Sequence, residues 1–244
     1  MSRGLATAFA SPEAKRRHVR RLFATVADRY DLITRVLSYG MDGRWKRRLI
    51  AKAAVQAGER ALDLATGTGD VAFALAASGA TVAGLDVTHR MLQLARAKQT
   101  YAAARHVTWT TGDMMALPFP NAVFTLVTTS YGLRNVPDLD QAVREIVRVL
   151  APGGRFLSLD FNRPEGRLLR AVYLAYLGAV GATLGWLLHG DPDTYRYISA
   201  SIRHYPGAAG VSDRLRRAGL SGVAAIPVLG GLMTIHVAHA PNAR

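Results

Sequence analysis

The stretch Ala61–Asp70, ALDLATGTGD, decides the fold. Its first residues are small or apolar except for Asp63, as is typical of a buried strand. Gly67 and Gly69 follow with one residue between them, and an apolar run over 71–77 then favours a helix. This order predicts a strand, a glycine turn and a helix N-terminus. Such a turn lets a ligand approach the backbone closely, and the free N–H groups of the helix would face that ligand.

Acidic residues follow the next two predicted strands. The apolar run Thr81–Leu85 ends at Asp86, where a carboxylate can accept both hydroxyls of a ribose. A third strand, Val107–Thr110, is followed by Asp113 and Met114, which could take the amino group and the ring face of an adenine. The glycine turn has the spacing D-x-x-x-G-x-G rather than G-x-G-x-x-G, which disfavours a pyrophosphate cradle.

These three strand ends together resemble the S-adenosylmethionine site of class I methyltransferases. The alternative is a plain doubly wound domain whose acids are incidental. The resemblance implies an α/β fold: a Rossmann-like, seven-stranded, mostly parallel sheet with helices on both faces and an antiparallel last strand. S-adenosyl-L-methionine is then the expected cofactor, and no metal is expected. The residues implied for cofactor binding are Tyr30, Asp63, Gly67, Thr68, Gly69, Asp86, Val87, Asp113, Met114 and Ser130.

The roles expected of these residues follow the shape of the cofactor. Gly67 and Gly69 would admit its methionine and ribose ends, and Thr68 would donate from its backbone or hydroxyl. Ser130 would face the methionine, and Tyr30 would close over the donor from the helices that precede the first strand.

Length and composition bound the class of protein. A chain of 244 residues, half of them hydrophobic, suits an α/β domain with a sizeable core. The absence of cysteine excludes disulfides, cysteine-based zinc sites and cysteine nucleophiles, and it allows a cytoplasmic location. The first residues lack the long apolar core of a signal peptide, so we expect no secretion.

Positive charge is concentrated near the N-terminus. The net charge is +14, and residues 1–60 hold 14 Lys or Arg against 5 Asp or Glu. The clusters at 15–17 and 46–48 (both KRR) could meet an anionic membrane surface or nucleic acid. Solvated helix faces explain them equally well, since 27 of the 31 basic residues are arginine. No aromatic ladder accompanies the charges, so nucleic acid is disfavoured as a partner, whereas peripheral contact with the inner face of the membrane stays open.

The sequence predicts one domain built from consecutive segments. Residues 1–20 are expected to form a mobile arm, followed by helices over 23–37 and 45–57. The segments are a basic helical preface and lid over 1–60, a cofactor-binding core over 61–162, an apolar helical insertion covering the acceptor site over 163–206, and a C-terminal helix with the last two strands over 207–244. Within them we expect strands over 123–129 and 155–161 with a helix over 138–150 between them, helices over 195–201 and 208–218, and strands over 223–228 and 232–238.

Residues 171–188 carry no formal charge and just reach the length of a membrane span. We reject a true span because the strands on either side must join one sheet. A helical hairpin over an apolar pocket is expected instead, with Gly178, Gly181 and Gly185 permitting close packing or bending. Partial insertion at a membrane surface stays open.

Nearly the whole chain from Phe23 resembles the ubiquinone/menaquinone biosynthesis C-methyltransferase (UbiE-like) family. Residues 30–45 match its first signature, Y-D-x-M-N-x-x-L-S-x-x-x-H-x-x-W, in register, and residues 148–154 (RVLAPGG) match its second, R-V-L-K-P-G-G. The stretches GDMMALPFP, YGLRNVPD, DPDTYRYISASI and GGLMTIH are similar to further family blocks. This chain departs from the signatures at Ile33, Thr34, Asp42, Ala151, Asp160 and Asn162.

The resemblance implies methylation of a ring carbon of a prenylated quinol, such as demethylmenaquinol or 2-methoxy-6-polyprenyl-1,4-benzoquinol, with S-adenosyl-L-homocysteine as the product. The departures leave open another phenolic or polyketide-like acceptor. From a different class, a non-catalytic basic protein that binds membrane or RNA would explain the charge. The retained cofactor acids argue against that reading. A homodimer stays open.

The acceptor chemistry suggests four catalytic candidates. A phenol with a pKa of about 10 ionises more readily beside a cation, and Arg134 follows the fourth strand at the ligand-binding edge. Its alternative role is a surface ion pair with Asp138. Asn135 could hold a quinol oxygen. Tyr195 and His236 resemble family positions and could act as acid–base or hydrogen-bonding groups, although a strand histidine is more often a satisfied core residue.

Overall fold

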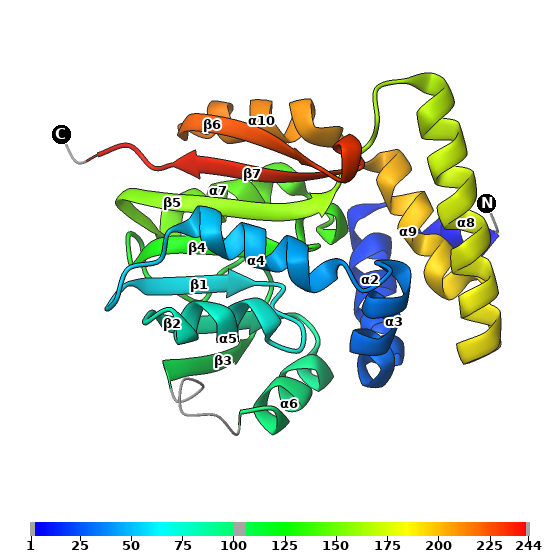
Figure 1. The fold of residues 1–244 in the computed structure, drawn as a ribbon, viewed down its shortest axis with the longest axis horizontal. Helices are drawn as coiled ribbons and strands as arrows, with labels where there is room; N and C mark the ends of the chain where they lie inside the picture. Colours follow the sequence, from blue (N-terminus) through cyan, green and yellow to red (C-terminus); the bar gives the residue numbers. More distant parts are fainter. Residues whose placement is uncertain (1–2, 100–105, 243–244) are drawn as a thin grey trace.

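The computed structural model describes residues 3–99 and 106–242 and is built around one seven-stranded sheet (Figure 1). Across the sheet the strands lie in the order β3-β2-β1-β4-β5-β7-β6. Strands β1 to β5 run parallel, and β7 is antiparallel to both of its neighbours. The predicted sheet is therefore confirmed. Its strands are β1 (Arg60–Leu64), β2 (Thr81–Asp86), β3 (Val107–Thr111), β4 (Phe124–Ser130), β5 (Leu150–Phe161), β6 (Ser221–Val228) and β7 (Met233–His239).

The strand order reverses at β1, which pairs with β2 on one side and with β4 on the other. In open α/β sheets ligands bind at such a switch point, outside the carboxyl ends of the strands. The residues that follow β1, β2 and β4 are therefore brought to a common edge, although they are far apart in the sequence.

Both faces of the sheet are covered by helices, and the strands are apolar on both sides, as expected of buried parallel strands. On β1 the neighbours Ala61 and Leu62 belong to different core clusters. One face carries α4 (Asp42–Ala53) and α5 (Asp70–Ala77), and the other carries α7 (Leu139–Val149) and α10 (Gly207–Arg217). The helix α6 (His89–Ala97) connects β2 with the segment that leads to β3.

The mobile arm predicted over 1–20 is wrong for the residues that the structure describes. They form α1 (Arg3–Ala8) and the start of α2 (Pro12–Val26). Ser11 caps α2 by accepting the N–H of Ala14 at 3.1 Å. Leu5 and Val19 are buried in a small cluster with Tyr197. In the sequence, Leu5 and Val19 stand among basic residues, which makes their apolar pattern hard to recognise. Their burial, rather than the surrounding charge, explains why this segment is ordered.

Two further helix boundaries differ from the prediction. The helix expected over 23–37 is interrupted by a 3₁₀ turn, η1 (Ala27–Arg29), before α3 (Tyr30–Leu37) begins. The helix expected to run to Ala57 ends at Ala53, because Ala54 adopts a left-handed conformation with φ of +46°. Gly58 lies beyond the helix in a turn, with φ of +83°.

The hairpin predicted within 171–188 is wrong. These residues belong to a single helix of 23 residues, α8 (Arg167–His189), which is capped by Gly190 with φ of +68°. The chain then turns into α9 (Asp193–His204), so the hairpin consists of two helices. Gly181 lies at their contact, where an added Cβ would be 2.7 Å from the carbonyl oxygen of Tyr195. Figure 1 shows α8 at the outer edge of the molecule, with α9 on its inner side.

Candidate active site

Two cavities meet at the carboxyl ends of the central strands. The strand-end cavity lies beside β1, β2 and β4. Predicted residues that line it are Tyr30, Gly67, Asp86, Val87, Asp113, Met114, Ser130 and Asn135. The helix-side cavity lies next to it, among α2, α3, α8 and α9, and it is lined by Tyr30, Arg134, Asn135 and Tyr195 among others. Tyr30 and Asn135 line both cavities, so they lie at the junction.

Asp86 organises the glycine turn. Its carboxylate accepts the N–H of Gly67 at 2.9 Å and the N–H of Thr88 at 2.8 Å. Burial raises the pKa of Asp86, while these backbone donors act in the opposite direction. An ionised carboxylate has about four acceptor positions and can accept hydrogen bonds from a ligand as well as from the backbone, and Asp86 lines the strand-end cavity.

The two glycines of the turn serve different purposes. Gly67 has φ of +56°, and a Cβ there would stand 3.7 Å from the ring of Tyr30, in the cavity wall. Gly69 has φ of +89°, and a Cβ there would lie 2.6 Å from the ring of Trp109. Gly69 is not among the described residues that line either cavity. It makes room for protein packing, whereas Gly67 permits the close approach of a ligand.

Asp63 and Thr68 line a small recess next to the strand-end cavity. Asp63 is almost fully buried and accepts the hydroxyls of Thr66 at 2.6 Å and Thr128 at 2.8 Å. Burial raises the pKa of Asp63 to about 6. The hydroxyl of Thr68 donates to Asp31 at 2.6 Å, so its proton is already engaged within the protein.

Two buried polar atoms that line the strand-end cavity, the hydroxyl oxygen of Ser130 and Oδ1 of Asn135, have no hydrogen-bond partner in the described structure, and the hydroxyl of Tyr197 in the helix-side cavity has none either. The amide nitrogen of Asn135 donates to the carbonyl oxygen of Tyr131 at 2.8 Å, which fixes the orientation of the side chain. Buried polar groups are normally hydrogen-bonded. A polar ligand at the junction would satisfy both atoms, and the acids and glycine turn around them fit a nucleoside.

Helix α2 closes the strand-end cavity from the outside. Arg16, Arg20 and Phe23 reach into it, and Arg16 forms an ion pair with Asp113 at 3.4 Å. The space left is about 90 Å³, below the roughly 300–1,000 Å³ of small-molecule sites. A cofactor therefore needs these side chains to withdraw, and a half-exposed arginine pair is weak enough to permit it. Lys15 holds the same helix against the site by donating to the carbonyl oxygens of Arg134 and Val136.

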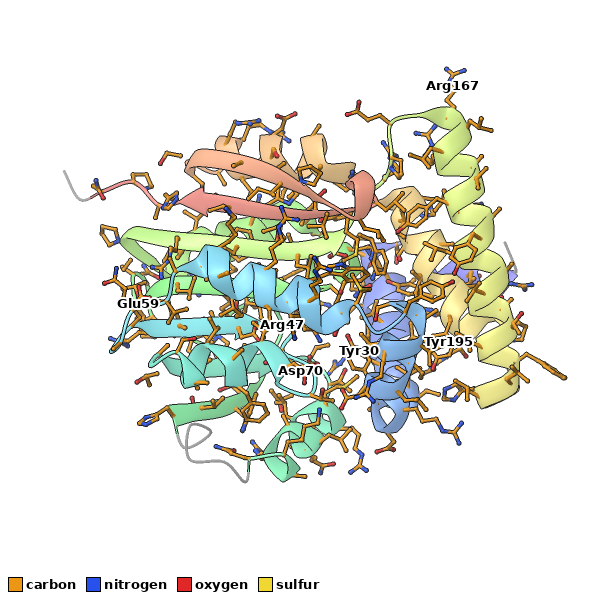
Figure 2. All side chains as sticks on the ribbon, in the orientation of Figure 1. Tyr30, Arg47, Glu59, Asp70, Arg167 and Tyr195 are labelled. Carbon is orange, nitrogen blue, oxygen red and sulfur yellow. The ribbon has the colours of Figure 1, made fainter. Side chains whose placement is uncertain are left out.

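The helix-side cavity is apolar and has a volume of about 490 Å³, within the range of small-molecule sites. Tyrosine is the commonest type among the described residues that line it. Figure 2 shows Tyr30 of α3 and Tyr195 of α9 in the region between the sheet and α8. Aromatic residues that line the cavity are Phe23, Tyr30, Tyr39, Trp45, Tyr131, Phe161, Tyr173, Tyr176, Tyr195 and Tyr197.

Arg134 lies at the wall of this cavity, but it does not form the surface pair with Asp138 that was the alternative. Arg134 is only 5% exposed and pairs with the equally buried Asp160 at 3.2 Å. It also donates to the hydroxyl of Ser201 and lies over the ring of Phe161. Burial raises the pKa of Asp160, and the Arg134 guanidinium acts against that rise. Asp138 instead caps α7.

The remaining two catalytic candidates, Tyr195 and His236, lie in different surroundings. The hydroxyl of Tyr195 lies 2.9 Å from Nε2 of His189, and burial raises the pKa of Tyr195 to about 12. His236 lies in β7, where its ring contacts the carbonyl oxygen of Ala208 at 3.0 Å and the hydroxyl of Ser158 at 3.5 Å. It is not among the described residues that line either cavity, so the satisfied core histidine is the reading that the geometry favours.

Sequence reasoning missed a polar chain beside the junction. The hydroxyl of Tyr131 donates to Asp42 at 2.7 Å, and Asp42 pairs with Lys46 at 2.7 Å. Tyr131 lines both cavities and has φ of +62°, a strained conformation that is frequent at functional sites. Burial and the Asp42 carboxylate raise its pKa. The one feature of the sequence that could have indicated this chain is Asp42, which stands where the family signature has histidine.

The fold and the site define a class I S-adenosylmethionine-dependent methyltransferase. A Thermotoga maritima structure described as an S-adenosylmethionine-dependent methyltransferase, possible histamine N-methyltransferase, has a TM-score of 0.64 at 17% identity, covering 91% of this chain and 99% of that one. The putative methyltransferase in a complex with the Haloferax volcanii Trm112 activator has a TM-score of 0.61 at 20% identity, covering 90% and 98%. At these identities the likeness shows the fold alone.

The chain belongs to the ubiE/COQ5 methyltransferase family, whose model matches residues 11–240. A demethylmenaquinone methyltransferase of Thermus thermophilus is 42% identical over 217 residues, which are 85% of this chain and 98% of the relative. A ubiquinone/menaquinone biosynthesis C-methyltransferase UbiE of Rubrivivax gelatinosus is 38% identical over 223 residues, 91% and 87% of the two chains. The expected family, fold and enzyme class are confirmed.

Proposed function

We propose that this methyltransferase acts on a ring carbon of a prenylated quinol in menaquinone or ubiquinone biosynthesis. The observation that carries the proposal is the junction of two unlike cavities. One has a ribose acceptor and a glycine turn, the other is apolar and aromatic, and Asn135 lines both. A donor and a lipophilic acceptor bound in this way lie side by side, which supplies the positioning on which methyl transfer depends. The names of the relatives support a quinol as the acceptor.

For the cofactor, we assign the ribose hydroxyls to Asp86 and the adenine to Asp113 and Met114. The methionine end would lie over Gly67 toward Ser130 and the recess of Asp63. Tyr30 would cover the donor from α3. When bound, the cofactor supplies an electrophilic methyl group and leaves as S-adenosyl-L-homocysteine.

For the acceptor, we assign three roles to residues of the helix-side cavity. The unpartnered Oδ1 of Asn135 accepts a hydrogen bond from a quinol hydroxyl. The positive charge of Arg134 favours the phenolate, which pushes electron density onto the neighbouring ring carbon. Tyr131, held by Asp42, offers its hydroxyl oxygen to the second polar edge of the ring. The aromatic walls keep water away from the reacting atoms, and the enzyme is expected in the cytoplasm.

The test uses labelled S-adenosylmethionine with detergent-solubilised demethylmenaquinol, a 2-methoxy-6-polyprenyl-1,4-benzoquinol, a simple phenol and RNA. We expect label in a quinol and none in RNA. An Asn135→Leu variant should bind the cofactor by calorimetry and lose most of its turnover, while Asn121→Leu, on the exposed loop before β4, should behave as the wild type. Transfer to the phenol but to neither quinol would overturn the proposed substrate.

A further inference from the structure

The outer face of α8 is apolar and exposed. Within the described residues it is the one helix long and apolar enough to cross a membrane, yet only 28% of its most apolar window is buried. The side chains that pack inward contact α9. Those that face outward recur at helical spacing along one stripe, which we name the α8 stripe: Leu168, Leu169, Val172, Tyr176, Trp186 and Leu187.

The exposure along this stripe is large. Leu168 is 79% exposed and Trp186 is 66% exposed. No charged residue interrupts the helix between Arg170 and His189. Contiguous exposed apolar surface on a soluble protein marks an interaction site, and a helix with one packed side does not need a second apolar side for folding.

Four arginines form a shallow groove at the N-terminal end of the same helix: Arg163, Arg167, Arg170 and Arg203. Figure 2 shows Arg167 at that end of α8, pointing away from the protein. The other residues that line the groove are apolar, Ala171, Leu174 and Ala175, and no carboxylate is among the described residues that line it. Guanidinium groups without acidic partners match phosphate groups in charge and geometry.

The α8 stripe is continuous with the rim of the helix-side cavity. Tyr176 belongs to the stripe and also lines that cavity. Two more exposed apolar residues line the cavity from other elements: Tyr39, which follows α3, is 75% exposed, and Leu229 is 51% exposed. The way into the acceptor cavity is thus bordered by apolar side chains that face outward.

We propose that the α8 stripe and the arginine groove form a docking surface for an anionic phospholipid bilayer. The apolar stripe lies in the interface between headgroups and acyl chains, and the arginines bind lipid phosphates. A prenylated quinol then passes from the bilayer into the helix-side cavity without exposing its tail to water. The substrate part of this inference rests on the proposed function, whereas bilayer binding does not.

The binding test is co-sedimentation of the full chain with vesicles of phosphatidylcholine, with and without phosphatidylglycerol. We expect binding to the mixed vesicles and a blue shift of Trp186 emission, since Trp186 is the one tryptophan with a side chain more than half exposed. Arg167→Gln with Arg170→Gln should weaken binding about 25-fold, which is roughly fivefold for each arginine. Trp186→Ser with Leu187→Ser should abolish the insertion of the stripe.

The matched control is Arg216→Gln with Arg217→Gln on α10, which removes the same charge from a different surface. It should leave binding within about twofold of the wild type, because attraction by net charge alone is not the proposed mechanism. Equal weakening by the control and the groove variant would overturn the docking surface. Failure of the wild type to bind mixed vesicles would overturn it as well.

Activity separates this inference from the proposed function. With quinol embedded in vesicles, the variant Trp186→Ser with Leu187→Ser should lose activity. With detergent-solubilised quinol the same variant should match the wild type, because neither Trp186 nor Leu187 lines either cavity. Equal activity of variant and wild type on vesicles would contradict the docking surface alone. Vesicle binding without methyl transfer in either medium would contradict the proposed function alone.

Discussion

At the scale of single residues, the site is defined by buried charges that are balanced in different ways. Asp86 is balanced by two backbone N–H groups, Asp160 by the Arg134 guanidinium, and Asp63 by two threonine hydroxyls. Neutral hydroxyl donors compensate a buried charge less completely than a cation does. Burial raises the pKa of Asp63 to about 6, so this carboxyl changes its protonation close to physiological pH.

The pKa of Asp63, raised to about 6 by burial, links stability to pH. Between about pH 4 and pH 6 the folded state holds a proton that the unfolded state has released, so the free energy of unfolding falls as pH rises through this window. Asp63→Asn should remove this contribution. The difference in free energy of unfolding between this variant and the wild type should change in favour of the variant by on the order of 1–3 kcal/mol between pH 4 and pH 7. Urea unfolding at several pH values checks this, and a pH-independent difference would contradict it.

The Arg134–Asp160 pair allows structural and catalytic roles to be separated. Arg134→Met leaves a buried carboxylate unpaired, which should cost about 3–5 kcal/mol of stability. Arg134→Met combined with Asp160→Asn removes both charges and should recover most of that loss. Turnover should stay low in the double variant, because no cation then lies beside the quinol. Urea unfolding and the methyl-transfer assay measure the two effects, and recovery of both together would make the pair structural only.

At the scale of elements, the α8–α9 hairpin shapes the helix-side cavity. Helix α9 supplies Tyr195 and Tyr197 to the cavity wall and Ser201 to Arg134, while α8 supplies Tyr173 and Leu177. The two helices approach closely because glycines on α8 face α9. The shape of the cavity therefore depends on this contact.

Two glycines of α8 provide a matched test. A Cβ on Gly181 would lie 2.7 Å from a backbone oxygen of α9, whereas a Cβ on Gly178 would lie 3.5 Å from the hydroxyl of Ser199. Gly181→Ala should destabilise the protein by about 1–3 kcal/mol because the backbone cannot yield easily. Gly178→Ala should be neutral or stabilising by up to about 1 kcal/mol. Thermal unfolding distinguishes them, and equal effects would contradict tight packing at Gly181.

The features that the sequence predicts well are those that depend on the order of strands and turns along the chain. Asp86 and Asp113 could be placed together because parallel strands bring their carboxyl ends to one edge. The partner of Arg134 could not be predicted, since it depends on the pairing of β4 with β5 and on the buried position of Asp160. The surroundings of His236 could not be predicted either, because the face that a strand residue occupies depends on register, here its pairing with Ser158.

At the scale of the whole molecule, three groups of elements enclose the two cavities. The strand ends of the sheet line the strand-end cavity, α2 and α3 lie over them, and α8 with α9 borders the helix-side cavity (Figure 1). Lys15 of α2 donates hydrogen bonds to the backbone of Arg134 and Val136, so this helix is directly linked to the segment that follows β4. The strand-end cavity and the helix-side cavity thus lie on two sides of the same junction.

The proposed enzyme requires that the donor nucleoside bind at the strand-end cavity, beside the acceptor. The decisive measurement is a crystal structure with S-adenosyl-L-homocysteine. We expect the nucleoside across the ends of β1, β2 and β4, with its ribose hydroxyls within hydrogen-bond distance of Asp86 and its sulfur facing Asn135. A structure with the nucleoside bound elsewhere, or with Arg16 and Phe23 still filling the cavity at saturating ligand, would contradict the account.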